Sequence, residues 1–342
     1  MRIGILTSGG DCPGLNAVIR GAVLKSSRVP GNEFVGFKYG WRGVVNADLM
    51  HLDRTSVRGL SKQGGTILGS SRTNPFEGPR GGPENISRVI KEHRIDAILA
   101  VGGEGTLTAA RRLAEAGLPV VGVPKTIDND LEATDYSFGF NTAVEIATEA
   151  VDRIRTTAES HQRCIVVEVM GRNAGWIALH AGMAAGAHAI LIPEHPRSIA
   201  QICEWVNSVR HRGRAPVIVV AEGFVLEGMT EAHSHKGLDS FERPRFGGIA
   251  DILAPMIEAH AGIESRATAL GFAQRGGVPS SYDRVLATRL GMAAVDLAMQ
   301  EHWGSMVALR GTEIVSVSIA EATHRPKLVP VQRYEEAAFL FG

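Results

Sequence analysis

One short segment brings a lysine, a threonine and two aspartates together: Pro124–Asp130 reads PKTIDND. Two carboxylates two residues apart in a loop can divide the work of a phosphoryl transfer, one as general base and one near a metal ion. Lys125 would supply positive charge for the transferring group, and we expect Asp128 to be the base. An Asx turn uses the same residue types and explains the segment equally well when it is considered alone.

Two glycine-rich segments also carry acidic side chains, Gly9-Gly10-Asp11 and Gly102-Gly103-Glu104-Gly105. Glycine lets backbone N–H groups approach an anion at the start of a helix. A tight turn between strand and helix would explain the glycines of the first segment, but not Asp11. In the second, Glu104 can hold Mg²⁺ directly or through water, and we expect Thr106 to be the helix N-cap.

These segments differ from the common nucleotide-binding motifs. Neither has the Gly-Lys-Ser/Thr that ends a Walker A loop, and neither matches Gly-x-Gly-x-x-Gly with a later ribose-binding acid. A nicotinamide or flavin dehydrogenase is therefore disfavoured.

Four arginines end or follow apolar runs, and the planar guanidinium suits two-pronged binding of phosphate. Each of them taken singly is an ordinary surface charge. Arg172 differs because it stands between an expected strand and an expected helix. The other three are Arg163, Arg266 and Arg275.

The segments with chemistry follow short apolar runs rich in β-branched residues, and helical patterns come after several of them. This alternation predicts right-handed βαβ units on a mostly parallel sheet. Ligands of such sheets bind beyond the carboxyl ends of the strands, so several polar loops in register are stronger evidence than one. Strands are expected over 3–7, 96–101, 120–123, 163–169 and 217–220, with helices over 15–24, 107–116 and 174–185.

Composition narrows the class of protein. A chain of 342 residues with 44% hydrophobic residues is long enough for two lobes. Its 36 basic and 36 acidic residues balance, which argues against a nucleic-acid or membrane-surface partner. Three distant cysteines, no apolar run of spanning length and an apolar N-terminal run too short for a signal peptide lead us to expect a cytoplasmic protein.

Taken together, the polar segments resemble the phosphofructokinase family. The resemblance runs from Met1 to the closing residues 334–342, in the family's order and spacing. The segment 226–248 and the ending resemble a bacterial subgroup that contains ATP-using and pyrophosphate-using enzymes. The matching runs are 7–16, 102–106, 124–130, 160–163, 169–172 and 274–277.

The resemblance implies an α/β fold of two similar-sized Rossmann-like lobes with mostly parallel sheets and an active site in the cleft between them. A nucleotide-binding lobe is expected over 1–138 plus roughly 252–305. A sugar-phosphate lobe is expected over 139–251 plus 306–342.

The resemblance also implies an ATP-dependent 6-phosphofructokinase of glycolysis, which moves the γ-phosphoryl of MgATP to the 1-hydroxyl of fructose 6-phosphate and yields fructose 1,6-bisphosphate. Asp128 matches the family's base, and Glu104 matches the Mg²⁺ carboxylate. Arg163 and Arg266 match arginines that complete a neighbouring subunit's site, which implies a homo-oligomer, commonly a tetramer.

Carried over by position, the site residues fall into three groups. Those matching catalytic positions are Asp128, Thr126, Arg172 and Lys125. Those matching the ATP site are Gly10, Arg72, Thr73, Gly102, Gly103, Glu104 and Gly105. Those matching the sugar-phosphate site are Thr126, Ile127, Asp128, Arg163, Met170, Gly171, Arg172, Glu222, Arg266, Phe272, Ala273, Gln274 and Arg275.

Three positions bear on specificity within the family. Gly105 leaves room for the α-phosphate of ATP, whereas an aspartate would fill that space and repel it. Lys125 matches a lysine of pyrophosphate-using members, and it is compatible with either donor. Phe272 stands where the family usually has a histidine that contacts the sugar phosphate, so one phosphate contact is missing.

The family's effector site also differs here, because Leu24 and His188 replace charged ligands. ATP is the expected donor, and a pyrophosphate-dependent enzyme is the second choice. A non-catalytic sensor of nucleotides or sugar phosphates is the alternative from another class, against which the intact Asp128, Glu104 and Arg172 weigh.

Overall fold

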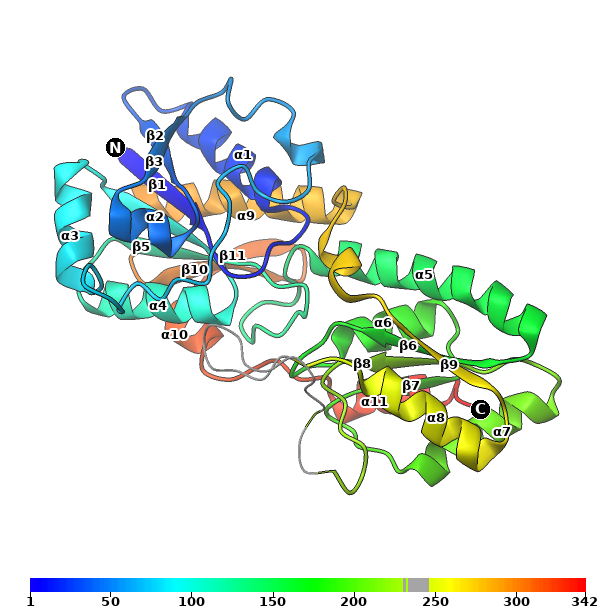
Figure 1. The fold of residues 1–342 in the computed structure, drawn as a ribbon. Coiled ribbons are helices and arrows are strands. Elements are labelled where there is room, and N and C mark those ends of the chain that lie inside the picture. Colours follow the sequence, from blue (N-terminus) through cyan, green and yellow to red (C-terminus); the bar gives the residue numbers. More distant parts are fainter. Residues whose placement is uncertain (230–231, 233–245) are drawn as a thin grey trace. The chain divides into compact units, whose positions relative to one another are not determined.

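The computed structural model describes residues 1–229, 232 and 246–342, and its chain forms two compact units, each around its own sheet (Figure 1). The first unit comprises Met1–Ile127, Leu131–Asn141 and Arg275–Pro326. The second comprises Asp128–Asp130, Thr142–Gln274 and Lys327–Gly342.

The sheet of the first unit has the strand order β11-β10-β5-β4-β1-β2-β3. Neighbours from β10 to β2 are parallel, and the edge strands β11 and β3 are antiparallel to theirs. The central strands β1, β4 and β5 therefore end at one edge. The bounds are β1 Arg2–Thr7, β2 Glu33–Phe37, β3 Leu49–Leu52, β4 Ala97–Gly102, β5 Val120–Pro124, β10 Ser305–Arg310 and β11 Glu313–Ser318.

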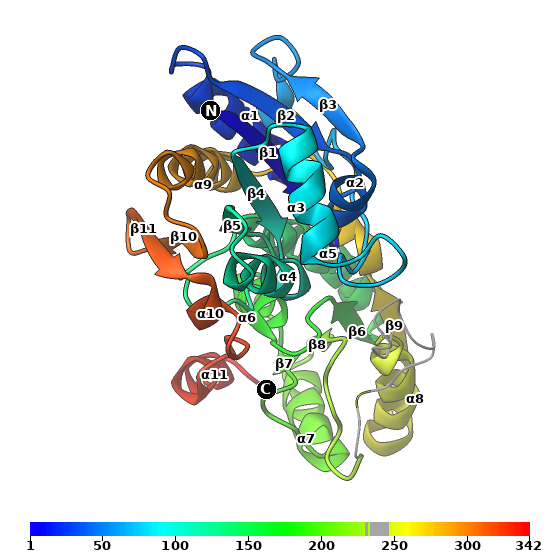
Figure 2. The same ribbon diagram turned by 90° about the vertical axis from the view of Figure 1, so that its left-hand side faces the viewer.

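Helices cover both faces of this sheet (Figure 2). On one face, α1 (Leu15–Ser26) and α9 (Ser281–Met299) pack closely through two glycines. A Cβ at Gly21 would lie 2.5 Å from the Thr288 carbonyl oxygen, and one at Gly291 would lie 2.3 Å from that of Val18. The other face shares a buried core with α2 (Trp41–Asn46), α3 (Pro83–Glu92), α4 (Glu104–Glu115) and α10 (Ile319–Ala322).

The sheet of the second unit is parallel throughout, in the order β7-β8-β6-β9. Alternate side chains of its strands form a core with α7 and α8, while α6 packs on the opposite side, where Gly182 approaches Ile190. The bounds are α5 Phe140–His161, β6 Cys164–Val169, α6 Trp176–Ala184, β7 Ala189–Leu191, α7 Ile199–His211, β8 Val217–Ala221, α8 Ile249–Ala261, β9 Ser265–Ala269 and α11 Val331–Ala338. Two 3-10 turns, η1 (Leu60–Lys62) and η2 (Gly271–Arg275), complete the described elements.

The expected α/β class with mostly parallel sheets is confirmed, and each predicted strand is found to within two residues. The expected N-cap at Thr106 is wrong. Helix α4 begins at Glu104 with Gly103 as its N-cap, and Thr106 is buried in the first turn against Gly102.

The expected lobe boundaries differ from the observed units in two long segments, besides the short stretches 128–130 and 139–141. Residues 252–274 belong to the second unit, because β9 pairs with β6. Residues 306–326 belong to the first unit, because β10 pairs with β5 and β11 with β10. Both differences come from strand pairing between residues far apart in the sequence.

Among the described residues, no helix is both long and apolar enough to cross a membrane.

Candidate functional site

Three polar loops meet at the carboxyl edge of the first unit's sheet, after β1, β4 and β5. The Ser8 N–H donates to the Val101 carbonyl oxygen at 3.0 Å, and the Lys125 N–H donates to that of Gly102 at 2.9 Å. The Gly9 N–H donates to the Ser71 carbonyl oxygen at 2.9 Å, which brings the Ser71–Thr73 segment to the same edge. The structure thus assembles the segments that carry the expected nucleotide contacts.

Lys125 lies at the centre of this group. Its side chain is only 5% exposed, and its Nζ donates a hydrogen bond to the Gly10 carbonyl oxygen. A Cβ at Gly9 would lie 3.8 Å from that Nζ, so glycine leaves open space beside the ammonium group. A cation in such a poorly solvated position acts more strongly on a nearby anion than one in water.

Arg275 packs directly on the first glycine loop. A Cβ at Gly10 would lie 1.8 Å from an Nη atom of Arg275, so a side chain there would displace the guanidinium. Glycine at position 10 therefore lets the guanidinium lie directly on this loop. The expected ATP contact at Gly10 and the expected sugar contact at Arg275 come together in the first unit.

Glu104 and Gly105 lie exposed at the beginning of α4, where the helix dipole and backbone N–H groups favour an anion. A Cβ at Gly105 would meet nothing within 4 Å, so there is open space at this position. No three His, Cys, Asp or Glu side chains of the described residues converge on a possible metal position. A lone carboxylate such as Glu104 fits Mg²⁺ that is held mainly by water and substrate phosphates, as is usual for this ion.

The Pro124–Asp130 segment passes from the first unit into the second between Ile127 and Asp128. The Thr126 N–H donates to Ser137 Oγ at 2.8 Å, which fixes the first half of the segment. Asn129 has a φ of 52° and is buried, so it is the residue that makes the turn. Asp128 is partly exposed. Asn129 therefore provides the left-handed residue of the turn, directly after the expected base Asp128.

In the second unit, the turn after β6 fits against the end of β8. The Glu222 N–H donates to the Val169 carbonyl oxygen at 2.9 Å, and the Gly223 N–H donates to that of Gly171 at 3.1 Å. These bonds place Met170, Gly171 and Arg172 beside Glu222 at one edge of the second sheet. The structure thus groups four of the expected sugar contacts.

Gln274 and Phe272 in η2 have opposite surroundings. Gln274 is completely buried, its Oε1 accepts the Met170 N–H at 3.2 Å, and its Nε2 donates to the Gly271 carbonyl oxygen. Gln274 therefore connects η2 to the end of β6. Phe272 is 78% exposed, and Ala273 next to it is exposed as well.

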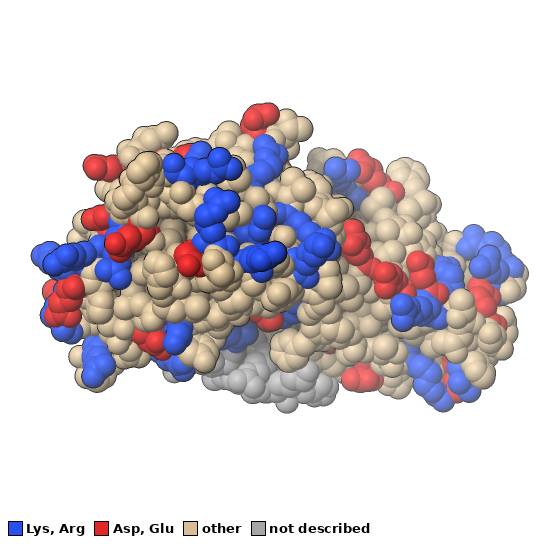
Figure 3. All heavy atoms as spheres, turned by 90° about the horizontal axis from the view of Figure 1, so that it is seen from above, with Lys and Arg blue, Asp and Glu red and all other residues tan. Residues whose placement is uncertain are grey.

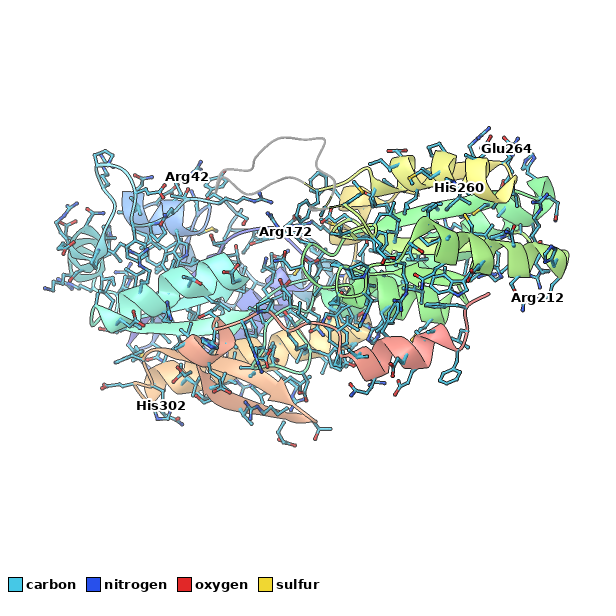
Figure 4. All side chains as sticks on the ribbon, turned by 90° about the horizontal axis from the view of Figure 1, so that it is seen from below. Arg42, Arg172, Arg212, His260, Glu264 and His302 are labelled. Carbon is cyan, nitrogen blue, oxygen red and sulfur yellow. The ribbon has the colours of Figure 1, made fainter. Side chains whose placement is uncertain are left out.

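Arg163 and Arg266 lie at the other edge of the second sheet. Arg163 precedes β6 and Arg266 begins β9, whereas Arg172 follows β6. Both pair with Glu264, which accepts from Arg163 Nε at 2.7 Å and from Arg266 Nη2. Figure 4 labels Glu264 and Arg172 at opposite ends of the second unit's sheet. One chain therefore does not bring these two arginines together with Arg172.

The fold also gathers charge that is dispersed along the sequence. Figure 3 shows a group of basic side chains on one face of the first unit, while blue and red intermingle over much of the remaining surface in view. Such a group attracts anions over a longer range than a single contact does.

Cys12, within the first glycine-rich run, is fully buried and donates through Sγ to the Phe138 carbonyl oxygen at 3.8 Å. Burial raises the pKa of this thiol to about 12, since an apolar environment disfavours the thiolate. It is therefore a packing residue and not a nucleophile.

Two residues near these groups escaped prediction from the sequence. Ser137 receives the Thr126 N–H, and Phe246 lies with its ring centroid 5.1 Å from Arg172 Cζ. Each contact joins two residues that are separated along the chain, so a local sequence pattern does not predict it.

Comparison with known proteins agrees with this geometry. The family profile described as phosphofructokinase matches residues 2–298. The chain belongs to the phosphofructokinase family. It is accordingly a phosphotransferase.

Phosphofructokinases with different names resemble the whole chain. A pyrophosphate–fructose 6-phosphate 1-phosphotransferase of Amycolatopsis methanolica is 56% identical over 100% of both chains. ATP-dependent 6-phosphofructokinase 3 of Streptomyces coelicolor is 52% identical, over 98% of this chain and 99% of its own. Among solved structures, the Pichia pastoris phosphofructokinase in the T-state aligns with a TM-score of 0.83 and 30% identity, over 99% of this chain and 36% of its own.

Proposed function

We propose that this chain is an ATP-dependent 6-phosphofructokinase, which transfers the γ-phosphoryl of MgATP to the 1-hydroxyl of fructose 6-phosphate. The observation that carries the choice of donor is the open space at Gly105, at the N-terminus of α4. An α-phosphate needs such space, and the helix N-terminus favours its charge.

In this proposal the Asp128 carboxylate accepts the proton of the sugar 1-hydroxyl as that oxygen attacks the γ-phosphorus. Lys125 and Arg172 offset the charge on the phosphoryl oxygens, and Thr126 and Ile127 border the sugar. Glu104 would hold Mg²⁺, which when bound would neutralise charge on the donor phosphates. The protein's own contribution is positioning and electrostatic stabilisation, as expected for phosphoryl transfer.

The choice of donor is tested with the substitution Gly105→Asp. Since a Cβ there meets nothing within 4 Å and the backbone is helical, the variant should fold like the wild type. We expect the ATP-dependent rate to fall by about 100-fold or more, because the new carboxylate occupies and repels the α-phosphate site, while any rate with pyrophosphate persists. Purified proteins are assayed for fructose 1,6-bisphosphate with each donor. Ala116→Asp, at an exposed residue with φ −83° after the other end of α4, controls for an added negative charge on the same helix.

A pyrophosphate-dependent enzyme is the second candidate, favoured by two observations. Lys125 is buried beside the glycine loops, where its charge would act on a small, highly charged donor. The Amycolatopsis relative named for pyrophosphate is also more similar to the chain than the Streptomyces relative named for ATP. If the wild type turns over with pyrophosphate and not with ATP, the ATP-dependent assignment is refuted and the pyrophosphate-dependent enzyme replaces it. Turnover with neither donor would restore the sensor hypothesis.

A further inference from the structure

The backbone of Arg172 is held tightly by its neighbours. Gly171 has a φ of 138°, a conformation that other residues rarely adopt. A Cβ at Gly223 would lie 1.9 Å from the Arg172 carbonyl oxygen, so the end of β8 packs against this peptide without room for a side chain. The point from which the arginine side chain leaves the chain is therefore fixed.

Beyond that point, the side chain of Arg172 has four rotatable bonds. The Phe246 ring lies over the guanidinium, with 5.1 Å between Arg172 Cζ and the ring centroid. An aromatic face attracts a cation and restricts its movement. The ring acts on the guanidinium through its π face, whereas phosphate is bound by the N–H groups of an arginine.

Phe246 is in turn connected to β6, the strand that precedes Arg172. Glu168 on β6 is only 6% exposed, and its carboxylate accepts the N–H groups of Gly248 and Ala250, each at 3.0 Å. These bonds fix the segment that leads from Phe246 into α8. Glu168 lies four residues before Arg172, so one strand determines the positions of both the ring and the arginine.

We propose that Phe246 is a positioning residue, which holds the Arg172 guanidinium with its N–H edge toward the phosphoryl group. The proposal deepens the function proposed above and rests on it for the part that Arg172 plays. In this proposal, the effect of Phe246 on the reaction passes through Arg172.

The test is a double-mutant cycle on kcat and KM with fructose 6-phosphate. We expect Phe246→Leu to lower kcat by about 3- to 20-fold, the range that loss of a partly desolvated cation–π contact gives. Phe246→Tyr keeps the ring face and should restore the wild-type rate. In an Arg172→Ala background, Phe246→Leu should change kcat less than twofold, because the partner of the ring is already gone.

Phe339→Leu is the matched control, since this phenylalanine is 91% exposed and distant in sequence from the site. Its rate should equal that of the wild type. Equal losses from Phe246→Leu with and without Arg172 would overturn the proposal, as would a Phe246→Leu variant that keeps the full rate. A purely structural role would produce such equal losses, together with a lower melting temperature.

Failure of the proposed function is recognised separately. A wild type that turns over fructose 6-phosphate with neither donor would refute that function. The wild type, Phe246→Leu, Arg172→Ala and the double variant are then compared by calorimetric binding of fructose 6-phosphate and of inorganic phosphate. Weaker binding in Phe246→Leu only when Arg172 is present supports the positioning role, and additive or absent effects refute it.

Discussion

At the scale of single residues, burial divides the acidic and basic groups of the site by function. Glu104 is exposed, as a group that shares a hydrated ion with phosphates should be. Lys125 is buried with its Nζ on a carbonyl oxygen, so its charge is fixed in place before any ligand arrives. Asp128 is partly exposed, which suits a base that must meet a hydroxyl. The surroundings of these three residues are thus compatible with the roles that the proposed function gives them.

Replacing Asp128 by asparagine tests its role as the base. The amide has nearly the same shape but cannot accept the proton, so we expect kcat to fall by about 10²- to 10⁴-fold. The KM for the donor and the melting temperature should change little. Initial rates and thermal unfolding measure these quantities, and Asp152→Asn, an exposed position on α5, provides the control. An Asp128→Asn enzyme with undiminished kcat would refute the assignment.

At the scale of elements, the sequence predicts local structure well and contacts between distant segments poorly. The runs that form β4 and β6 are completely buried, so their β-branched residues record both strand and burial. The position of Thr106 inside α4 depends on its packing against Gly102 and the neighbouring loops. The pairing of β10 with β5 joins segments more than 180 residues apart, which no local pattern can show. The contact between Phe246 and Arg172 also joins distant segments, so the sequence did not predict it.

One connection between elements should depend on pH. His188 precedes β7, its N–H donates to the Val217 carbonyl oxygen at 2.8 Å, and its Nδ1 accepts the Val217 N–H at 3.0 Å. The pKa of His188 is lowered from 6.5 to about 4, chiefly by burial and then by the nearby charges of Arg155, Arg214 and Arg212, against the opposing effect of Glu159. The folded state therefore favours the neutral ring.

Since the folded pKa lies below the unfolded value, the contribution of His188 to stability is fully present above about pH 6.5. It is lost as the pH falls from about 6.5 toward 4. In His188→Asn the Oδ1 atom can accept the same N–H but does not titrate. We expect the melting temperature of the wild type to drop more than that of the variant between pH 7.5 and pH 5, measured by calorimetry. Parallel pH profiles would contradict the assignment.

At the scale of the whole molecule, the site residues of the second unit occupy both edges of one sheet. Arg172 follows β6, while Arg163 and Arg266 lie near the start of β6 and β9 and share Glu264. A strand of five or six residues separates the two edges by about 17–20 Å. One small sugar phosphate does not bridge that distance, so the expected substrate role of the far-edge arginines requires the site of another chain. This argument from geometry supports the proposal of a homo-oligomer with shared sites.

Shared sites predict that two inactive variants will complement each other. Asp128→Asn lacks the base, and the double variant Arg163→Ser, Arg266→Ser lacks the arginines offered to a neighbour. When both are co-expressed with different tags, a hybrid pair contains one site with Asp128 from one chain and both arginines from the other. Random pairing makes about a quarter of all sites complete in a two-fold assembly.

We expect the doubly tagged fraction to be far more active than either parent, and light scattering to show an oligomer. Only arginines that act across the subunit boundary can restore a site in the hybrid. If a fraction proven to contain both chains has only the mean activity of the two parents, each chain completes its own site.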